Sequence, residues 1–224
     1  METEIIHSDE PVTLLGAAEP VAPALARALE LAPRLVAADG GANVALAAGL
    51  MPEAVIGDLD SLGDAARAAL PPDRILEVPE QISTDFEKCL TRIAAPLVIG
   101  VGFTGGRLDH LLAALAVLTR YPARRCLLLG PDEIVFLAPP RIAIELPRGT
   151  RVSLFPLAEV RGRSLGLRWP IDGLVLAPDG RLGTSNEALG PVEFTADRPS
   201  LLAILPASAL RAAVAALAGS ERWP

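Results

Sequence analysis

The sequence predicts a mixed α/β protein, with an N-terminal parallel-sheet, Rossmann-like domain followed by a small antiparallel β-sandwich domain. Short apolar runs alternate with helical patterns over the first half of the chain, which is typical of a parallel sheet covered by helices. The pattern changes near Pro139-Pro140, after which short β-like runs are separated by turn signals. We therefore expect a first domain over residues 1–138 and a second over residues 139–224.

Strands and helices are expected to alternate in the first domain. The expected strands are 12–16, 34–38, 54–56, 74–78, 97–101 and 126–129. The expected helices are 21–31, 42–48, 64–70, 85–92 and 110–120. Right-handed crossovers between such elements place the strands parallel, with helices on the faces of the sheet.

Short strands separated by turns are expected in the second domain. The expected elements are strands 142–146, 151–157, 174–176, 192–196 and 201–205, and a terminal helix 210–218. Turn signals such as Pro178-Asp179-Gly180 separate the strands, as in a small antiparallel sandwich.

Composition excludes several classes of protein. The chain has 224 residues, of which 51% are hydrophobic and 21% charged, so it is globular and not disordered. A net charge of −7 argues against a sequence-independent grip on nucleic acid. No stretch of about 20 apolar residues is present to span a membrane, and the first ten residues do not resemble a signal peptide. Cys89 and Cys126 lie in apolar runs, so we expect reduced core thiols and a soluble cytoplasmic protein.

Aspartates follow the expected strands. Asp39 comes directly after strand 34–38, Asp58 and Asp60 come after strand 54–56, and Asp109 follows strand 97–101 at a greater distance. Asp85 opens the helix that follows strand 74–78. The carboxyl ends of parallel strands meet at one edge of the sheet, so these side chains are expected to gather there. Clustered carboxylates need a cation, and hard oxygen ligands without histidine or thiolate suit Mg²⁺ held together with substrate phosphates.

Glycines and cations accompany the aspartates. Gly40-Gly41 and Gly105-Gly106 allow backbone amides to approach an anion closely. Arg107 and Lys88 are the candidate cations for phosphate oxygens. The chain has neither a Walker motif nor a strict Gly-x-Gly-x-x-Gly fingerprint, so an ordinary P-loop or dinucleotide site is excluded.

Structural roles remain open for several of these residues. Asp39-Gly40 alone is a common turn, and Asp109 could cap the helix that follows it. Ser61 with Asp64, and Thr84 with Glu87, fit capping boxes. His110 is more simply a packed or capping residue than a general base.

Six short motifs occur in order along the chain. In the first half they are Asp-Gly-Gly-Ala-Asn at 39–43, Gly-Asp-Leu-Asp-Ser at 57–61, Ser-Thr-Asp-Phe-Glu-Lys at 83–88 and Gly-Gly-Arg-Leu-Asp-His at 105–110. In the second half they are Gly-Leu-Arg-Trp-Pro at 166–170 and Gly-Thr-Ser-Asn-Glu at 183–187. Together these motifs resemble those of the thiamine pyrophosphokinase family. Two features depart from the family pattern: Ala114 stands where an Asn is frequent, and the chain beyond Leu210 has no recognised counterpart.

The resemblance implies a role for each matching residue. It places Mg²⁺ and the ATP phosphates on Asp39, Asp58, Asp60, Asp85 and Asp109. It makes Arg107 and Lys88 catalytic together with Asp58, Asp60, Asp85 and Asp109, and it adds to the ATP site Gly40, Gly41, Asn43, Thr84, Gly105 and Gly106. It places thiamine on Trp169, with Ser185 and Asn186 reaching it from the partner chain of a homodimer. A flat cationic thiazolium suits an indole face, although Trp169 could also be a core residue.

The implied reaction is the transfer of diphosphate from ATP to the hydroxyl of thiamine, giving thiamine diphosphate and AMP. Catalysis would consist mostly of positioning and charge stabilisation. Two alternatives remain open: a pyrophosphokinase that acts on a pterin alcohol, and a non-catalytic sensor of a nucleotide or of thiamine diphosphate.

Overall fold

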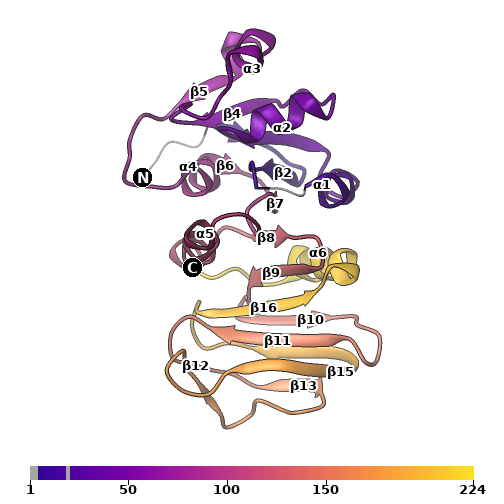
Figure 1. Ribbon diagram of the computed structural model, residues 1–224. Coiled ribbons are helices and arrows are strands. Elements are labelled where there is room, and N and C mark those ends of the chain that lie inside the picture. The colour runs from indigo at the N-terminus through magenta and orange to yellow at the C-terminus, as the bar shows by residue number, and fades with distance from the viewer. Residues whose placement is uncertain (1–4, 19–20) are drawn as a thin grey trace. The chain divides into compact units, whose positions relative to one another are not determined.

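The protein, described by a computed structural model over residues 5–18 and 21–224, divides into two compact units (Figure 1). The first takes in the chain up to Val117 together with Leu128–Pro131, and the second comprises Leu118–Leu127 and Asp132–Pro224. This division assigns residues 118–127 and 132–138 to the second unit, whereas the sequence suggested a single boundary after residue 138. Residues 1–4, part of the polar segment that does not resemble a signal peptide, lie outside the described residues.

A parallel sheet with strand order β7–β2–β3–β4–β5 forms the centre of the first unit. Its strands are β2 (Val12–Leu15), β3 (Arg34–Ala38), β4 (Ala54–Gly57), β5 (Ile75–Glu77) and β7 (Val98–Val101). Every residue of β2, β4 and β7 is buried, as expected for a sheet covered on both faces. The predicted mixed α/β fold with a parallel sheet is confirmed.

Helices connect these strands. They are α1 (Ala22–Leu29), α2 (Gly41–Ala47), α3 (Asp64–Ala69), α4 (Asp85–Arg92) and α5 (Leu108–Arg120), with a 3₁₀ turn η1 (Pro72–Arg74) before β5. The chain passes from β2 outward to β5 and then returns to β7 on the other side of β2. Right-handed crossovers therefore place α4 on the face opposite α1 and α2, and Figure 1 shows α1 and α4 on opposite sides of β2. This reversal creates a switch point between β2 and β7, where ligands bind in sheets of this kind.

The two expected capping boxes have different outcomes. Thr84 is the N-cap of α4, and its side chain accepts a hydrogen bond from Glu87 N at 3.3 Å. The expected cap at Ser61 is wrong, because α3 begins after Gly63 without a side-chain cap. The Ser61 hydroxyl donates instead to Asp60 Oδ1 at 2.9 Å, so the residue belongs to the acidic loop and not to the helix.

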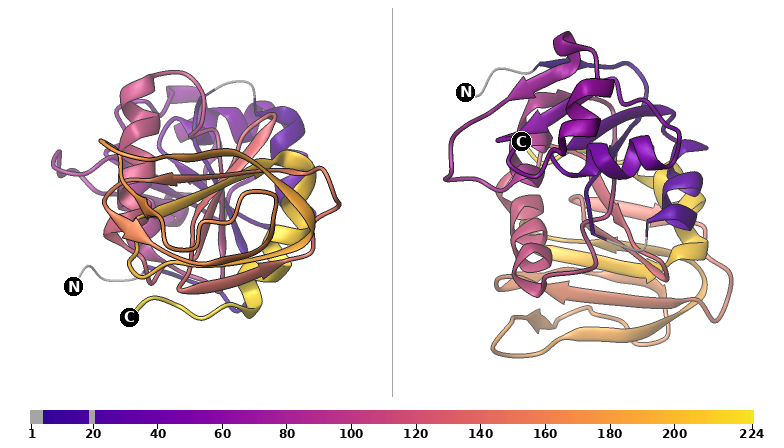
Figure 2. Two further views of the ribbon diagram at one scale, coloured as in Figure 1. Left: turned by 90° about the horizontal axis from the view of Figure 1, so that it is seen from below. Right: turned by 45° about the horizontal axis from the view of Figure 1, so that its top comes forward.

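An antiparallel arrangement characterises the second unit, with strand order β9–β16–β11–β15–β10 and β13 paired to β15. The long strand β15 pairs with β11 through its first part and with β10 and β13 through its second, and β11, β15 and β16 run side by side in Figures 1 and 2. The elements are β9 (Glu133–Leu137), β10 (Arg141–Ile144), β11 (Arg151–Pro156), β13 (Ser164–Leu167), β15 (Gly183–Thr195), β16 (Leu201–Pro206), the paired β12 (Val160–Arg161) and β14 (Val175–Leu176), the 3₁₀ turn η2 (Ala207–Ala209) and α6 (Leu210–Gly219).

Several strands of the structure were not predicted from the sequence. The largest omission is β9, although Ile134-Val135-Phe136 forms a β-branched and aromatic run between Asp132 and Pro139. The first part of β15, the short strands β12 and β13, and the small parallel pair β1 (Ile6–His7) and β6 (Ile93–Ala94) were also missed. These segments are only two residues long or contain polar residues or glycine, so they give weak strand signals, and pairing with neighbouring strands stabilises them.

The remaining expectations about the core agree with the structure. Cys89 in α4 and Cys126 in β8 (Cys126–Leu129), a strand divided between the two units, are buried free thiols. None of the helices in the described part of the chain is long and apolar enough to cross a membrane.

Candidate active site

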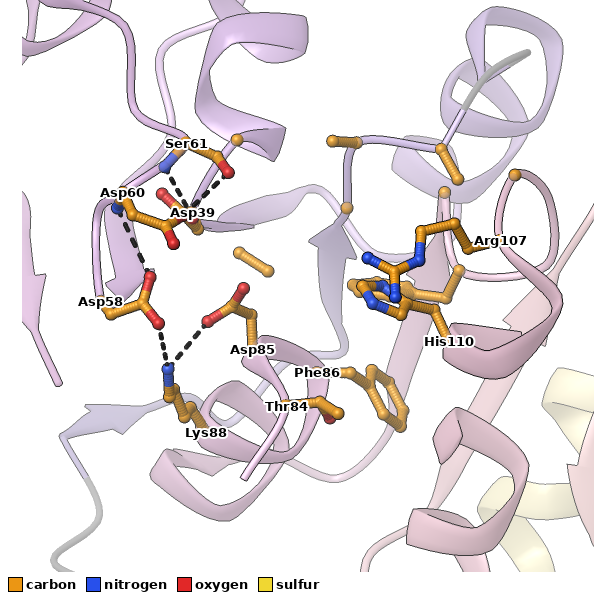
Figure 3. A pocket seen from close by; sticks show the side chains of 18 of the residues that line it. Asp39, Asp58, Asp60, Ser61, Thr84, Asp85, Phe86, Lys88, Arg107 and His110 are labelled. Atoms are coloured by element: carbon orange, nitrogen blue, oxygen red, sulfur yellow. Dashed lines mark hydrogen bonds and ion pairs between the residues drawn. The ribbon is translucent and has the colours of Figure 1, made fainter. Parts of the chain in front are cut away.

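A cleft of about 650 Å³ lies at the carboxyl edge of the parallel sheet in the first unit (Figure 3). The loops that follow β2, β3, β4 and β7 line it, together with the segment that leads into α4. The cleft thus occupies the switch point between β2 and β7, as the topology predicts.

Three of the predicted aspartates converge in this cleft. Carboxylate oxygens of Asp39, Asp58 and Asp60 all lie within 4.8 Å of one another. Leu59 explains how two of them meet, because its side chain is buried in an apolar cluster that includes Val55 and Leu62. With Leu59 at φ 66° and anchored in the core, the carboxylates on either side of it are available to the cleft.

Asp39 is the most buried member of the trio. It follows β3 at φ 41° with only 2% of its surface exposed, and its Oδ2 accepts a hydrogen bond from Ser61 N at 3.2 Å. Its Oδ1 is buried without a hydrogen-bond partner among the described residues. Burial, with the negative charges of Asp85 and Asp60 nearby, raises the pKa of Asp39 to about 6. A divalent cation would stabilise this arrangement, because it would offset the repulsion among the three carboxylates and bind the unpartnered oxygen.

Lys88 connects this trio to Asp85. Its ammonium lies 2.9 Å from Asp58 Oδ2 and 3.1 Å from Asp85 Oδ1 (Figure 3). Burial opposes the charged form of Lys88, but the two carboxylates outweigh it and raise the pKa of the ammonium. The hydrogen bond from Lys88 in turn holds the pKa of Asp58 below its ordinary value. Lys88 is therefore engaged by carboxylates in this structure.

Gly57 allows Asp39 and Asp85 to lie on either side of it. A Cβ atom at this position would be 2.7 Å from Asp39 Cβ and 3.3 Å from Asp85 Oδ1. A larger residue would push the two acidic side chains apart, so the glycine at the end of β4 is part of the site's geometry.

Asp109 lies apart from the acid trio. Its carboxylate forms two hydrogen bonds with Arg107, Nε–Oδ1 at 3.1 Å and Nη2–Oδ2 at 2.6 Å, and Arg107 lowers the pKa of Asp109. It falls in the first turn of α5 and is not among the described residues that line the cleft, whereas Arg107 and His110 are. His110 is exposed there, so it is not a packed residue.

The predicted phosphate-binding residues also divide into two groups. Gly40, Thr84, Gly105 and Gly106 line the cleft. Gly41 and Asn43 do not appear in its described wall, and each has a structural contact instead. A Cβ on Gly41 would lie 2.1 Å from Leu15 O, so this glycine allows α2 to pack on the end of β2. Asn43 donates to Ser61 O at 2.8 Å and accepts from Gly63 N at 3.0 Å, which fixes the acidic loop.

Several residues of the cleft were not predicted from the sequence. Gln81 donates to Asp58 Oδ2 at 2.9 Å, and Phe86 and Phe103 form an aromatic pair with ring centroids 4.8 Å apart. Gln81 gave no signal because it lies in a loop of irregular structure. Phe86 lies inside the motif at 83–88, directly after Asp85, and Phe103 stands two residues before the motif at 105–110, so these positions could have indicated both rings.

Trp169, Ser185 and Asn186 gather in the second unit. Asn186 Nδ2 donates to Trp169 O at 2.7 Å, and Ser185 N donates to Ser153 Oγ at 3.0 Å. The alternative that Trp169 is a core residue is wrong, because 56% of its surface is exposed. The Arg168 guanidinium lies 5.6 Å from the centroid of the indole ring, within cation–π range.

The fold and the site together define an α/β protein with an acidic cleft at the carboxyl edge of a parallel sheet. The family models for the catalytic domain of thiamin pyrophosphokinase and for its vitamin B1 binding domain match residues 25–128 and 141–201. The chain belongs to the thiamine pyrophosphokinase family.

Individual relatives agree with this assignment. The chain is 27% identical over 154 residues to "Thiamine pyrophosphokinase 1" of Oryza sativa subsp. japonica. This alignment covers 60% of this chain and 58% of that relative. The chain is also 27% identical over 183 residues to "Thiamine pyrophosphokinase 1" of Arabidopsis thaliana, covering 66% of this chain and 68% of the relative. The match to the rice protein thus spans less than two thirds of that protein's length.

Solved structures share the fold. Thiamin pyrophosphokinase from Candida albicans superposes with a TM-score of 0.75 at 15% identity, covering 90% of this chain and 93% of that one. The enzyme from Geobacillus thermodenitrificans gives a TM-score of 0.74 at 23% identity, covering 88% and 96%.

Proposed function

We propose that this chain is a thiamine pyrophosphokinase, which transfers the diphosphate of ATP to the hydroxyl of thiamine and releases AMP. The observation that carries the proposal is the convergence of Asp39, Asp58 and Asp60, with one buried oxygen unpartnered, in the domain that matches the family's catalytic model. The printed names of the relatives support the same reaction. They do not favour a pterin pyrophosphokinase or a sensor.

The acid trio fits a Mg²⁺ ion. Asp39, Asp58 and Asp60 would hold the ion, because their converging carboxylates are hard ligands and one of them, Asp39, has an unpartnered oxygen. When bound, Mg²⁺ would neutralise phosphate charge. Lys88 links Asp85 to the trio, because its ammonium pairs with both Asp85 and Asp58. Asp109 would act together with Arg107, with which it forms an ion pair.

The remaining cleft residues would bind and orient ATP. Gly40, Gly105 and Gly106 leave room for phosphate oxygens near backbone amides, and Arg107 is an exposed cation at the same cleft. In the reaction, the hydroxyl oxygen of thiamine forms a bond to the β-phosphorus, and the bond from that phosphorus to the oxygen bridging the α-phosphorus breaks. A carboxylate of the cleft takes the proton of the hydroxyl, and AMP leaves with the bridging oxygen. In-line alignment of these groups is the main contribution of the protein.

We also propose that the second unit is a thiamine-binding β-sandwich and that the enzyme is a cytoplasmic homodimer with thiamine at the subunit boundary. The match to the vitamin B1 binding model supports the first of these. The exposed indole of Trp169 offers a face for the thiazolium, and Asn186, which follows Ser185 on β15, hydrogen-bonds to Trp169 of the same chain.

Product analysis tests the proposal directly. Purified protein is incubated with ATP, Mg²⁺ and thiamine, and AMP and thiamine diphosphate are separated by chromatography. We expect equal amounts of both products, formed only when thiamine is present. Asp58→Asn should abolish turnover, while Asp64→Asn, an exposed position on α3, serves as the matched control. AMP formed without thiamine diphosphate, or no product although both substrates bind, would contradict the proposal.

A further inference from the structure

Lys88 is the only lysine in the sequence, which otherwise uses arginine for its basic side chains. Its residue is 1% exposed, and it is among the largest fully buried side chains of the described chain. A buried ammonium is unfavourable unless oppositely charged groups and hydrogen bonds surround it. The burial of the Lys88 ammonium therefore indicates that its positive charge has a specific role at this site.

The two partners of Lys88 come from different parts of the first unit. Asp58 belongs to the loop after β4, 30 positions before Lys88, whereas Asp85 is one turn away on α4. A lysine suits this geometry because its ammonium is a compact point charge with three donors, whereas the fork of an arginine is planar and larger. The contact ties the acidic loop to the start of the helix.

The contact also selects between the two oxygens of Asp58. Oδ2 accepts hydrogen bonds from Lys88 and from Gln81, each at 2.9 Å. Within the described part of the chain, Oδ1 accepts a hydrogen bond only from the amide of Asp60, at 3.4 Å. Lys88 and Gln81 therefore occupy one oxygen and leave the other on the side of the acid trio.

We propose that Lys88 is the built-in counter-ion of the acid cluster, which holds Asp58 and Asp85 in place before a divalent cation binds. It is a positioning residue that acts through these carboxylates, not a phosphate contact. The inference rests on the proposed function only for the identity of the cation. With this counter-ion, the four carboxylates Asp39, Asp58, Asp60 and Asp85 would stay together until the cation arrives.

Removal of the charge should have opposite effects on the metal-free and metal-bound states. In Lys88→Met, the side chain keeps most of its length but the carboxylates lose their cation, so their mutual repulsion increases. We expect a lower Tm in EDTA than for the wild type. Because the cluster becomes more negative, we expect Mg²⁺ to bind about tenfold more tightly and to raise Tm by more than in the wild type. Arg67→Met, which removes an exposed cation from α3, is the control for net charge.

Because there is a single lysine, its ammonium can be observed directly. With ¹⁵N-lysine labelling, one side-chain NMR signal should appear in EDTA, protected from fast exchange by its two carboxylate partners. The signal should shift on titration with Mg²⁺ and should disappear in Lys88→Met. A signal that exchanges as fast as free lysine would contradict the proposal.

A double variant distinguishes charge compensation from simple packing. Asp58→Asn combined with Lys88→Met removes both charges, and its Tm in EDTA should recover part of the loss seen in Lys88→Met. If Lys88→Met folds only with Mg²⁺, the proposal is supported. If neither variant folds, or if Mg²⁺ affinity is unchanged or weaker in Lys88→Met, Lys88 is not the counter-ion.

These measurements contain no ATP or thiamine, so they are independent of the proposed reaction. A wild-type protein whose Tm does not respond to Mg²⁺ would contradict the metal assignment. The EDTA comparison of the single and double variants would still decide the role of Lys88.

Discussion

Asn186 holds the backbone of Trp169 from both sides: its Oδ1 accepts from Trp169 N at 3.2 Å, and its Nδ2 donates to Trp169 O at 2.7 Å. Asn186 is 6% exposed, whereas Trp169 is 56% exposed. A buried amide on β15 thus fixes the main chain of an exposed indole just beyond β13. This arrangement presents an aromatic face without burying it in the core.

Asn186→Ala should weaken thiamine binding more than turnover. Loss of the amide leaves Trp169 N and O without these partners, so the indole becomes less well positioned. We expect KM for thiamine to rise about tenfold, as for the loss of one to two hydrogen bonds, with KM for ATP unchanged. Steady-state kinetics measures this effect. In a Trp223→Phe background, fluorescence anisotropy of the remaining Trp169 should fall on the same substitution; unchanged anisotropy and KM would contradict this role.

Asn43→Ala should loosen the acidic loop without removing any carboxylate. The Asn43 side chain makes two hydrogen bonds to this loop, to Ser61 O and from Gly63 N. Its loss should cost roughly 1–3 kcal/mol of stability and should weaken Mg²⁺ binding. Urea unfolding and Mg²⁺ titration measure the two effects. Asn43→Asp, which keeps the acceptor for Gly63 N, should be affected less. Equal Mg²⁺ affinity in Asn43→Ala and wild type would contradict a positioning role.

The sequence predicted the parts of the site that depend on local signals. Each of Asp39, Asp58 and Asp60 follows a buried apolar strand, so their convergence follows from the parallel sheet alone. Thr84 was predicted as a cap because Glu87 stands three residues later, and the structure places it there.

Other features depend on contacts between distant residues, which a sequence pattern does not contain. Gly41 belongs to the same motif as Gly40, yet only the packing of α2 on Leu15 shows that it has a structural role. Ser61 fits a capping box, but Asp39 and Asp60 take up its amide and hydroxyl. Gln81 stands in an irregular loop, and only the fold brings it to Asp58.

Protonation of Asp39 should stabilise the metal-free protein as the pH falls from 7 to about 5. The pKa of Asp39 is raised to about 6 in the folded protein, so the folded state binds this proton more tightly than the unfolded state does. The gain should be roughly 1–2 kcal/mol when solvent near the cleft is allowed for. Asp58 has the opposite sign: its pKa is lowered, and the stability it contributes is lost as the pH falls through its ordinary value towards that lowered pKa.

Thermal unfolding in EDTA across this pH range checks the expectation. Asp39→Asn should remove the gain between pH 7 and 5 and should be more stable than wild type at pH 7 without metal. Asp64→Asn, on an exposed turn of α3, should leave the pH profile unchanged. A wild-type Tm that falls steadily from pH 7 to 5 would contradict the raised pKa.

Gly41→Ala should destabilise the first unit strongly, although alanine is the better helix former. Gly41 opens α2, and an added Cβ would lie 2.1 Å from Leu15 O and 2.9 Å from Leu15 C, both atoms of the β2 backbone. Because β2 is central in the parallel sheet, neither element can move away without loss of packing, and we expect a cost of about 3 kcal/mol or more. Gly219→Ala is the matched control, since Gly219 also lies in a helix but has no atom within 4 Å of the added Cβ. That variant should be neutral or more stable by up to about 1 kcal/mol. Equal stability of the two variants in urea unfolding would show that α2 can shift away from β2, and with it Asp39, which immediately precedes this helix.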